Sequence, residues 1–261
     1  MIATRAAFDS PNLISGMSIV DTSALAWPGT TFSISDSAGA AQVESSYKLL
    51  AGSIGCDRHL IATVRQVHGS NIVRVSDTTA IDQVRNSCAD GLLTTVPGIL
   101  LGVKLADCCG VLLHDPVRGV VAAVHSGWRG TAANITGAMI DRLVGEVGCD
   151  VSNIHAWLSP CASGQAYEVG ADVADVLSEF CTPTSDALRS DSPPIAPPIE
   201  PKWYFDNHRA IVHQLVARGV PEDNISVDRA CTIGDVRYHS FRRDAGRSGR
   251  MLAFIGMREK P

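Results

Sequence analysis

The segment LADCCGVLLHD, residues 105–115, places an aspartate and two adjacent cysteines at the start of an apolar run. A cysteine thiol can act as a nucleophile beside a base, or as a ligand of a soft metal ion. Either role gains from a nearby imidazole, and the segment GVVAAVHSGW that follows supplies His125. The first question is therefore which of Cys108 and Cys109 meets that side chain.

Two apolar segments flank the turn DPVR and are predicted to pair as a β-hairpin. If His114 lies opposite Gly119, then Cys108 lies opposite His125, with Cβ atoms roughly 4.5–5.5 Å apart on one face. Cys109 then points to the other face, because successive strand residues alternate. We therefore predict that Cys108 carries the chemistry and that Cys109 is a packing residue. A one-residue bulge in either strand would exchange the two roles.

His68, in the segment VRQVHGSN, is the candidate for a third group. It is predicted to lie at a strand end before a Gly-Ser turn, where a side chain can project into a cleft. Two imidazoles and one thiolate around Zn²⁺ leave a coordination position open, which is typical of a catalytic site. Spacing alone does not bring His68 to the hairpin. The residues by themselves therefore leave two readings open, a nucleophile with its base and a metal site.

The composition is that of an ordinary globular protein, with 261 residues, 45% hydrophobic and 19% charged. A net charge of −5 gives no basic field for nucleic acid, so no nucleic-acid partner is expected. Lys104 and Asp107 interrupt the most apolar stretch, so no membrane span is expected either. The first residues do not resemble a signal peptide, and the eight cysteines contain no CxxC pair. We predict a cytoplasmic protein with reduced cysteines.

The pattern of elements predicts helices packed over a sheet in a single domain, residues 1–261. Strands are expected over 60–67 and 71–75, in the hairpin, and in NIHAWLSP, NISVD and MLAFIGM. Because the hairpin strands are apolar at nearly every position, both faces of their sheet should be covered. Helices are expected in the three segments TAANITGAMIDRLVGEVG, with Thr131 as N-cap, AYEVGADVADVLSEF and FDNHRAIVHQLVARG. A proline-rich loop is predicted at about 190–201.

Six motifs occur in an order that resembles the laccase-domain family, also called multicopper polyphenol oxidoreductase-like. They are RQVHGSNIVRV, ADGLLTT, LADCCGVLLHD, VAAVHSGWRGTAANI, SPC…YEVG and YHSFRRDAGRSGR. The resemblance implies an α+β fold, a four-layer α/β/β/α sandwich of mixed sheets covered by helices. It also implies a metal, usually zinc, held by His68, Cys108 and His125. The chain departs from the family pattern at Gly110, where a proline is usual, and before Tyr167, where a second cysteine-bearing stretch is missing.

The resemblance implies a zinc-dependent purine nucleoside phosphorylase with adenosine deaminase activity on the same site. The expected partners are phosphate and purine nucleosides, namely adenosine, inosine, guanosine and methylthioadenosine; a homo-oligomer is allowed. Arg129, beside the metal strand at a predicted helix start, and Arg243, in a basic loop, are the chosen anion contacts. For the basic loop, a solvated turn with salt bridges to Asp244 is the alternative. Asp107 would either orient a ligand imidazole or accept a hydrogen bond from the backbone at its strand end.

Two alternative functions stay open. The first is a copper-dependent polyphenol oxidase, because a His₂Cys set also suits copper. A four-copper laccase is disfavoured, since such enzymes use paired HxH motifs and the eight histidines here contain none. The second alternative is a metal-free cysteine hydrolase with Cys108 as nucleophile and His125 as base.

Overall fold

The computed structural model describes residues 3–23, 25–184 and 202–259. Its strands are β1 (Thr4–Ala6), β2 (Leu13–Ser18), β3 (Ile61–Ala62), β4 (Ile72–Arg74), β5 (Gly91–Thr94), β6 (Leu100–Leu105), β7 (Cys109–Asp115), β8 (Val120–Ser126), β9 (His155–Leu158), β10 (Glu168–Val169), β11 (Cys181–Pro183), β12 (Trp203–Phe205), β13 (Ile225–Val227) and β14 (Met251–Met257). Its α-helices are α1 (Ala40–Ile54), α2 (Ile81–Asn86), α3 (Trp128–Ala132), α4 (Ile135–Arg142), α5 (Ala171–Ala174), α6 (Asn207–Ala217) and α7 (Phe241–Asp244).

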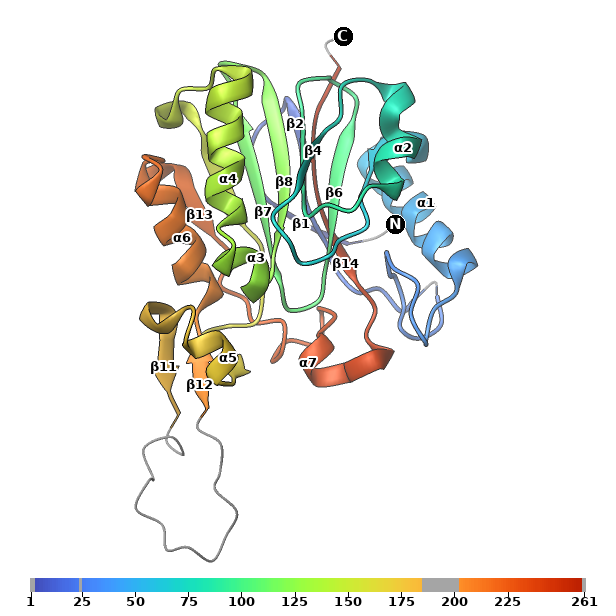
Figure 1. Cartoon of the computed structure of the whole chain (residues 1–261). Helices are drawn as coiled ribbons and strands as arrows, with labels where there is room; N and C mark the ends of the chain where they lie inside the picture. The colour runs from blue at the N-terminus through green and yellow to red at the C-terminus, as the bar shows by residue number, and fades with distance from the viewer. Residues whose placement is uncertain (1–2, 24, 185–201, 260–261) are drawn as a thin grey trace, which may run out of the picture.

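Two mixed sheets form the centre of the molecule (Figure 1). One has five strands in the order β1-β2-β14-β6-β3, and the other has six in the order β13-β9-β7-β8-β5-β4. Helix α1 covers the outer face of the first sheet, whereas α4 and α6 cover the outer face of the second. A small antiparallel sheet, β10-β12-β11, lies at one end with α5 (Figure 1). The predicted four-layer α/β/β/α sandwich is confirmed.

Strand alternation divides the side chains of β8 and β14 between the layers. Ala253 and Ile255 of β14 pack with Ala123 of β8 in the core between the two sheets. Phe254 points the other way, toward Leu50 of α1. Because both faces of these strands are covered, β8 is buried at every position, as its continuous apolar sequence predicts.

The β7–β8 hairpin has a different register from the one that we predicted. Asp115 pairs with Val120, so the loop spans residues 116–119, and the residue opposite His125 is Gly110 rather than Cys108. The four-residue loop is shifted by one residue, so that β7 runs to Asp115 and β8 begins at Val120, and Gly119 closes the turn with a positive φ of 61°. The error is two positions, an even number, and the strand period is two. Cys108 therefore still lies on the face of His125, diagonally displaced and just before β7.

The helix predictions have mixed outcomes. The helix over 207–217 is confirmed, with Asp206 as its N-cap accepting from the Arg209 amide. The helix over 131–148 is divided at Asn134, which has a φ of 54° and is the N-cap of α4 in place of Thr131. The helix over 166–180 is mostly wrong: this segment holds β10, the four-residue α5 and a 3-10 turn. Its apolar residues pack in a small cluster around Phe205 of β12, and short elements are sufficient to bury them.

The predicted proline-rich loop at about 190–201 lies outside the described residues. Among the helices of the described residues, none is both long and apolar enough to cross a membrane.

Candidate metal centre

The two sheets bring three candidate ligands together at one end, where they line a cavity: His68, Cys108 and His125. Their ligand atoms all lie within 4.8 Å of one another. His125 is the last residue but one of β8, and Cys108 directly precedes β7. His68 lies in the segment between β3 and β4. The two imidazole rings are nearly perpendicular, with centroids 4.8 Å apart and an interplanar angle of 81°. The structure thus brings together the three residues that the sequence selected.

Asp90, just before β5, fixes both histidines. Its carboxylate accepts from Nδ1 of His125 at 2.8 Å and from the backbone amides of Val67, His68 and Gly69 at 3.2, 3.0 and 2.8 Å. These three bonds hold His68 at a positive φ of 59°, a conformation that few non-glycine residues adopt. Because Asp90 occupies Nδ1, His125 is left with Nε2 for an ion, as in carboxylate–histidine–zinc triads.

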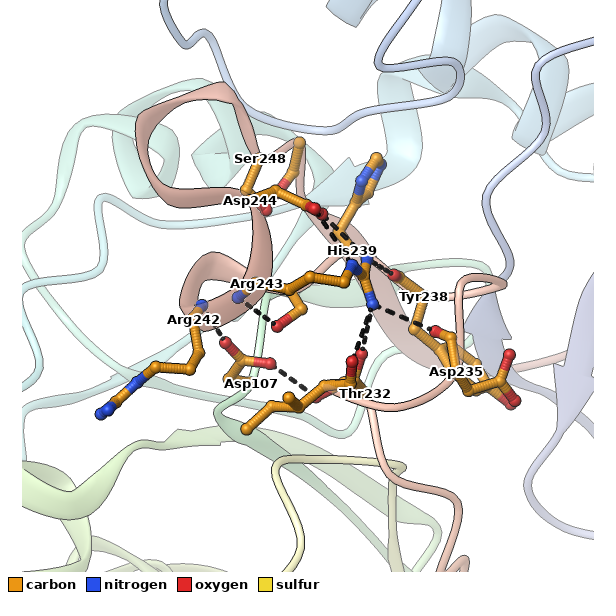
Figure 2. A network of polar contacts seen from close by, with 12 residues as sticks. Asp107, Thr232, Asp235, Tyr238, His239, Arg242, Arg243, Asp244 and Ser248 are labelled. Atoms are coloured by element: carbon orange, nitrogen blue, oxygen red, sulfur yellow. Dashed lines mark hydrogen bonds and ion pairs between the residues drawn. The ribbon is translucent and has the colours of Figure 1, made fainter. Parts of the chain in front are cut away.

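Asp90 is the functional residue that sequence reasoning missed. The sequence carried a signal, since ADG places a carboxylate at the start of a wholly buried strand. Of the two roles predicted for Asp107, the structure shows the hydrogen bond to backbone and not the contact with an imidazole. Its carboxylate accepts from the Thr232 hydroxyl at 2.7 Å and from the Arg242 amide at 2.6 Å, which ties α7 to the end of β6 (Figure 2).

Electrostatics at the three residues favour a thiolate beside an imidazolium. Burial acts to raise the pKa of the Cys108 thiol, but the charges of His125 and His68 and hydrogen bonds from both lower it to about 6. Burial acts to lower the pKa of His125, yet the Cys108 thiolate and the Asp90 carboxylate raise it to about 9. The donor set therefore fits a soft divalent cation, which binds thiolate and neutral imidazole.

Gly127 keeps the space around the thiol open. A Cβ atom at this position would lie 2.7 Å from Sγ of Cys108 and 3.4 Å from the His68 ring. Gly110, where the family usually has proline, is equally constrained: an added Cβ would lie 2.9 Å from that of Ala253. Its amide also donates to the Ser159 hydroxyl at 2.9 Å, a bond that proline cannot make.

The three residues line a cavity of about 670 Å³. Its wall carries five cationic side chains and a single carboxylate, that of Asp107. The aromatic residues of the wall are Trp128, Tyr167 and Phe241; the cations are Arg65, Lys104, Arg129, Arg242 and Arg250. A cavity of this size, charge and aromatic content suits a small anionic or mixed anionic and aromatic ligand.

The two predicted anion contacts have different positions. Arg129 lines the cavity and stacks on the Trp128 ring, 4.2 Å from its centroid. Arg243 does not line it: its guanidinium donates to the carbonyls of Thr232 and Tyr238 at 2.9 and 2.8 Å and pairs with Asp244 (Figure 2). Arg243 therefore fastens the loop that precedes α7, and its ion pair with Asp244 is the alternative predicted for the basic loop.

Its neighbour Arg242 extends away from that network (Figure 2) and into the wall of the cavity. Its guanidinium lies 5.3 Å from the Tyr167 ring centroid. Within the described part of the chain, the guanidinium groups of Arg129 and Arg242 make no ion pair with a carboxylate. These two cations are free to bind an anionic ligand.

A four-layer sandwich with a Cys-His₂ set at one end of its sheets defines an α+β class of fold with a candidate metal centre. The chain belongs to the family described as multi-copper polyphenol oxidoreductase laccase, whose sequence model matches residues 23–258. It is 33% identical over 201 residues to the purine nucleoside phosphorylase YlmD of Geobacillus stearothermophilus, covering 75% of this chain and 71% of that one. A purine nucleoside phosphorylase of Mycobacterium tuberculosis, Rv2149c, is 32% identical over 235 residues, with coverage of 88% and 86%.

Solved structures agree with this assignment. The crystal structure of YlmD from Geobacillus stearothermophilus superposes with a TM-score of 0.81 at 28% identity, covering 95% of this chain and 93% of that one. The Bacillus licheniformis protein YfiH gives the same TM-score at 25% identity, with coverage of 96% and 98%.

Binding of a divalent cation at this centre should release protons. Between about pH 6 and pH 9 the empty pair holds a Cys108 thiolate and a His125 imidazolium, so an ion displaces the imidazolium proton. We expect log K for Zn²⁺ to rise by about one unit per pH unit over this interval and to level off above pH 9, once corrected for buffer and hydroxide binding. Zinc titration against a competing chelator at several pH values checks this slope. A slope near zero at pH 7–8 would contradict the thiolate–imidazolium pair.

Proposed function

We propose that the chain is a zinc-dependent purine nucleoside phosphorylase whose metal is held by His68, Cys108 and His125. The observation that carries the proposal is the convergence of these three ligands on the wall of a cavity that also presents unpaired arginines and aromatic rings. The activity named for the relatives points to the same substrates. Zinc is favoured because one thiolate and two imidazoles form a tetrahedral set with one open position.

Phosphate is expected to bind between Arg129 and Arg242. Arg129 belongs to α3 and Arg242 to α7; both line the cavity, and neither has a carboxylate partner among the described residues. Arg250 adds positive charge from the start of β14; two loop carbonyls hold one of its terminal nitrogens, and burial lowers its pKa. Planar guanidinium groups bind phosphate in pairs of hydrogen bonds, which gives both affinity and orientation. Arg242 thus replaces Arg243 as the second anion contact.

The purine base is expected to lie against the aromatic part of the wall. Tyr167 and Trp128 stand beside the two arginines, and Phe241 is 54% exposed although it is large and apolar. An exposed aromatic ring on a cavity wall can stack on a purine, which removes both surfaces from water. A base sandwiched in this way would leave the ribose toward the arginines.

Phosphorolysis then needs few protein groups. A phosphate oxygen forms a bond to the anomeric carbon of ribose while the bond from that carbon to the purine nitrogen breaks. The base leaves with the electron pair and takes up a proton. The arginines hold the phosphate within attacking distance, and such positioning accounts for a large part of the rate in reactions of this kind. Bound zinc supplies a Lewis acid on the same wall of the cavity.

The test is phosphate-dependent release of free base from adenosine, inosine and guanosine by protein of known metal content. We expect release to require phosphate and to be lost in the His68→Ala variant. Conversion of adenosine to inosine in the same assay, without phosphate, would show the deaminase activity that the family resemblance also implies. If no base is released from any nucleoside by metal-loaded protein, the proposal is wrong.

Replacing Arg242 by alanine should weaken phosphate binding without changing the fold. Charge-assisted hydrogen bonds contribute about 1.5–3 kcal/mol each, so we expect KM for phosphate to rise roughly 10- to 100-fold. KM for the nucleoside should change much less. Arg74→Ala is the matched control, because Arg74 is exposed and outside the cavity. Equal effects of the two substitutions on KM for phosphate would refute the assigned contact.

One observation favours a second candidate, the cysteine hydrolase. Cys108, His125 and Asp90 together have the arrangement of a nucleophile, a base and a carboxylate that orients the base. Such a site needs no second imidazole on the sulfur, yet His68 also hydrogen-bonds to Cys108. Alkylation by iodoacetamide separates the readings: protection of Cys108 by bound zinc supports the metal centre. Amide hydrolysis by metal-free protein, lost in Cys108→Ala, would support the hydrolase.

A further inference from the structure

The sequence predicted Cys109 to be a packing residue, but its environment is not purely apolar. Its side chain leaves β7 on the face opposite to that of Cys108 and meets two other soft donors, Cys161 and His208. Their ligand atoms lie within 4.8 Å of one another, and the two cysteines are fully buried. Cys161 follows β9, and His208 is in the first turn of α6. Three segments far apart in the sequence thus place thiol, thiol and imidazole at one point.

We propose that Cys109, Cys161 and His208 form a second metal site, which takes one closed-shell thiophilic cation, Zn²⁺ or Cu⁺. This site is independent of the nucleoside chemistry proposed above. It lies between the six-stranded sheet and α6, whereas the first centre faces the cavity at the end of the sheets. The adjacent cysteines would therefore serve two ions, one on each side of the strand.

The distances fit an ion of this kind. Around a tetrahedral ion with bonds of about 2.3 Å to sulfur and about 2.0 Å to nitrogen, a sulfur and a nitrogen ligand stand about 3.5 Å apart. Sγ of Cys161 and Nε2 of His208 are already 3.2 Å apart. The Ser159 carbonyl oxygen lies 2.8 Å from the same nitrogen and 3.7 Å from Sγ of Cys109. When Nε2 binds an ion and gives up its proton, this carbonyl is free to act as a fourth donor.

The donor types select the cation. Two thiolates and one imidazole in an apolar interior favour soft d¹⁰ ions over Mg²⁺ or Ca²⁺, which require oxygen ligands. No carboxylate belongs to this group of three. The surroundings include Leu158, Val124 and Ile211, which keep bulk water from the sulfurs. On binding, the ion displaces the remaining thiol and imidazole protons of the three ligands to solvent, and no oxidation occurs.

The imidazole of the group lies next to a second cavity. This cavity, of about 240 Å³, is lined by Asp206, His208 and Arg229, with Arg209, Val212 and Val227 completing its wall. His208 is 6% exposed, whereas both cysteines are fully buried and do not line the cavity. His208 is therefore the member of the group nearest to an opening.

An ion here would add metal–ligand bonds to the hydrogen bonds and apolar contacts that already join three elements. It would link the start of β7, the loop after β9 and the start of α6. The ligand from β7, Cys109, directly follows Cys108 of the first centre in the chain. We therefore expect the ion to stabilise the fold, because its three ligands are brought together only in the folded chain and the unfolded chain has no such site. In thermal unfolding, added Zn²⁺ should raise Tm even in a chain whose first centre is disabled.

The experiment counts ions in the full-length chain, freed of metal under reducing conditions and then titrated with Zn²⁺ or with Cu⁺. We expect two bound ions in the native chain, one in His68→Ala and one in Cys161→Ala. Cys149→Ala is the matched control, because Cys149 is a buried cysteine outside both groups, and it should bind two. The cation that displaces the other from the second site of the His68→Ala chain is the metal that this site prefers.

Co²⁺ loaded into the His68→Ala chain gives a second readout, through thiolate-to-metal charge-transfer absorption that should be lost when Cys161→Ala is added. Because His68 is exposed, its substitution leaves the second group intact, so the spectrum of the His68→Ala chain tests the site even if Cys161→Ala does not fold. The proposal is overturned if His68→Ala binds no ion. It is equally overturned if mass spectrometry finds a Cys109–Cys161 disulfide that persists under reduction.

Discussion

Cys108→Ala is expected to remove the ion at the first centre and to reduce kcat/KM for phosphorolysis by at least about 10³-fold. A metal ion contributes several kcal/mol to such a reaction, and each 1.4 kcal/mol is about a factor of ten. The thiolate is the only anionic ligand of the three, so its loss leaves two neutral imidazoles, a weak set for zinc. Metal content and phosphate-dependent base release, measured on the same preparation, check this expectation.

Cys149→Ala is the control for removing a cysteine, since Cys149 is buried in the core beside α4 and outside the cavity. It should keep both the metal and the activity. Cys109→Ala should retain the ion bound to His68 and His125, because the Cys109 side chain is on the opposite face of β7. Loss of that ion in Cys109→Ala, with retention in Cys108→Ala, would reverse the assignment of the two adjacent thiols.

Asp90→Asn should have the second largest effect. The Asp90 carboxylate accepts four hydrogen bonds, from Nδ1 of His125 and from three amides of the His68 loop. Burial acts to raise its pKa, but these bonds, with the charge of His125, lower it, so the group is an anion in the folded protein. In Asp90→Asn one of the two acceptor oxygens is replaced by an NH₂ group, a donor that faces the N–H groups of the protein. We expect metal affinity to fall about 10- to 100-fold and the free energy of unfolding to fall by about 2–3 kcal/mol.

The lowered pKa of Asp90 gives the sign of a pH effect. An acid whose pKa is depressed on folding stabilises the native state above its unfolded pKa, and that stabilisation is lost as the pH falls toward the folded value. Wild-type metal-free protein should thus lose stability below about pH 4, and part of that loss should be absent in Asp90→Asn. Urea unfolding at pH 3–7, with Asp141→Asn on the exposed face of α4 as control, measures the difference.

Several features of the fold and the site followed from local sequence. Continuous apolar strands predicted a sheet covered on both faces, and the helical spacing of apolar residues in FDNHRAIVHQLVARG predicted α6. The period of two placed Cys108 and Cys109 on opposite faces, and it did so even though the predicted register was wrong. An even register error moves neighbours along a strand but leaves each side chain on its own face. Local geometry was sufficient because alternation is a property of the strand itself.

Other features depend on contacts between distant parts of the chain, and only the tertiary structure decided them. Asp90 lies 22 residues from the His68 amide and 35 from the His125 ring that it holds. Arg242 and Arg243 are adjacent and identical in type, yet one lines the cavity and the other bonds to loop carbonyls. The sequence by itself determined which residue types were present and which face of a strand each occupied. The packing of the two sheets decided which of them share a site, because donors 50 or 100 residues apart meet only when a common core is buried.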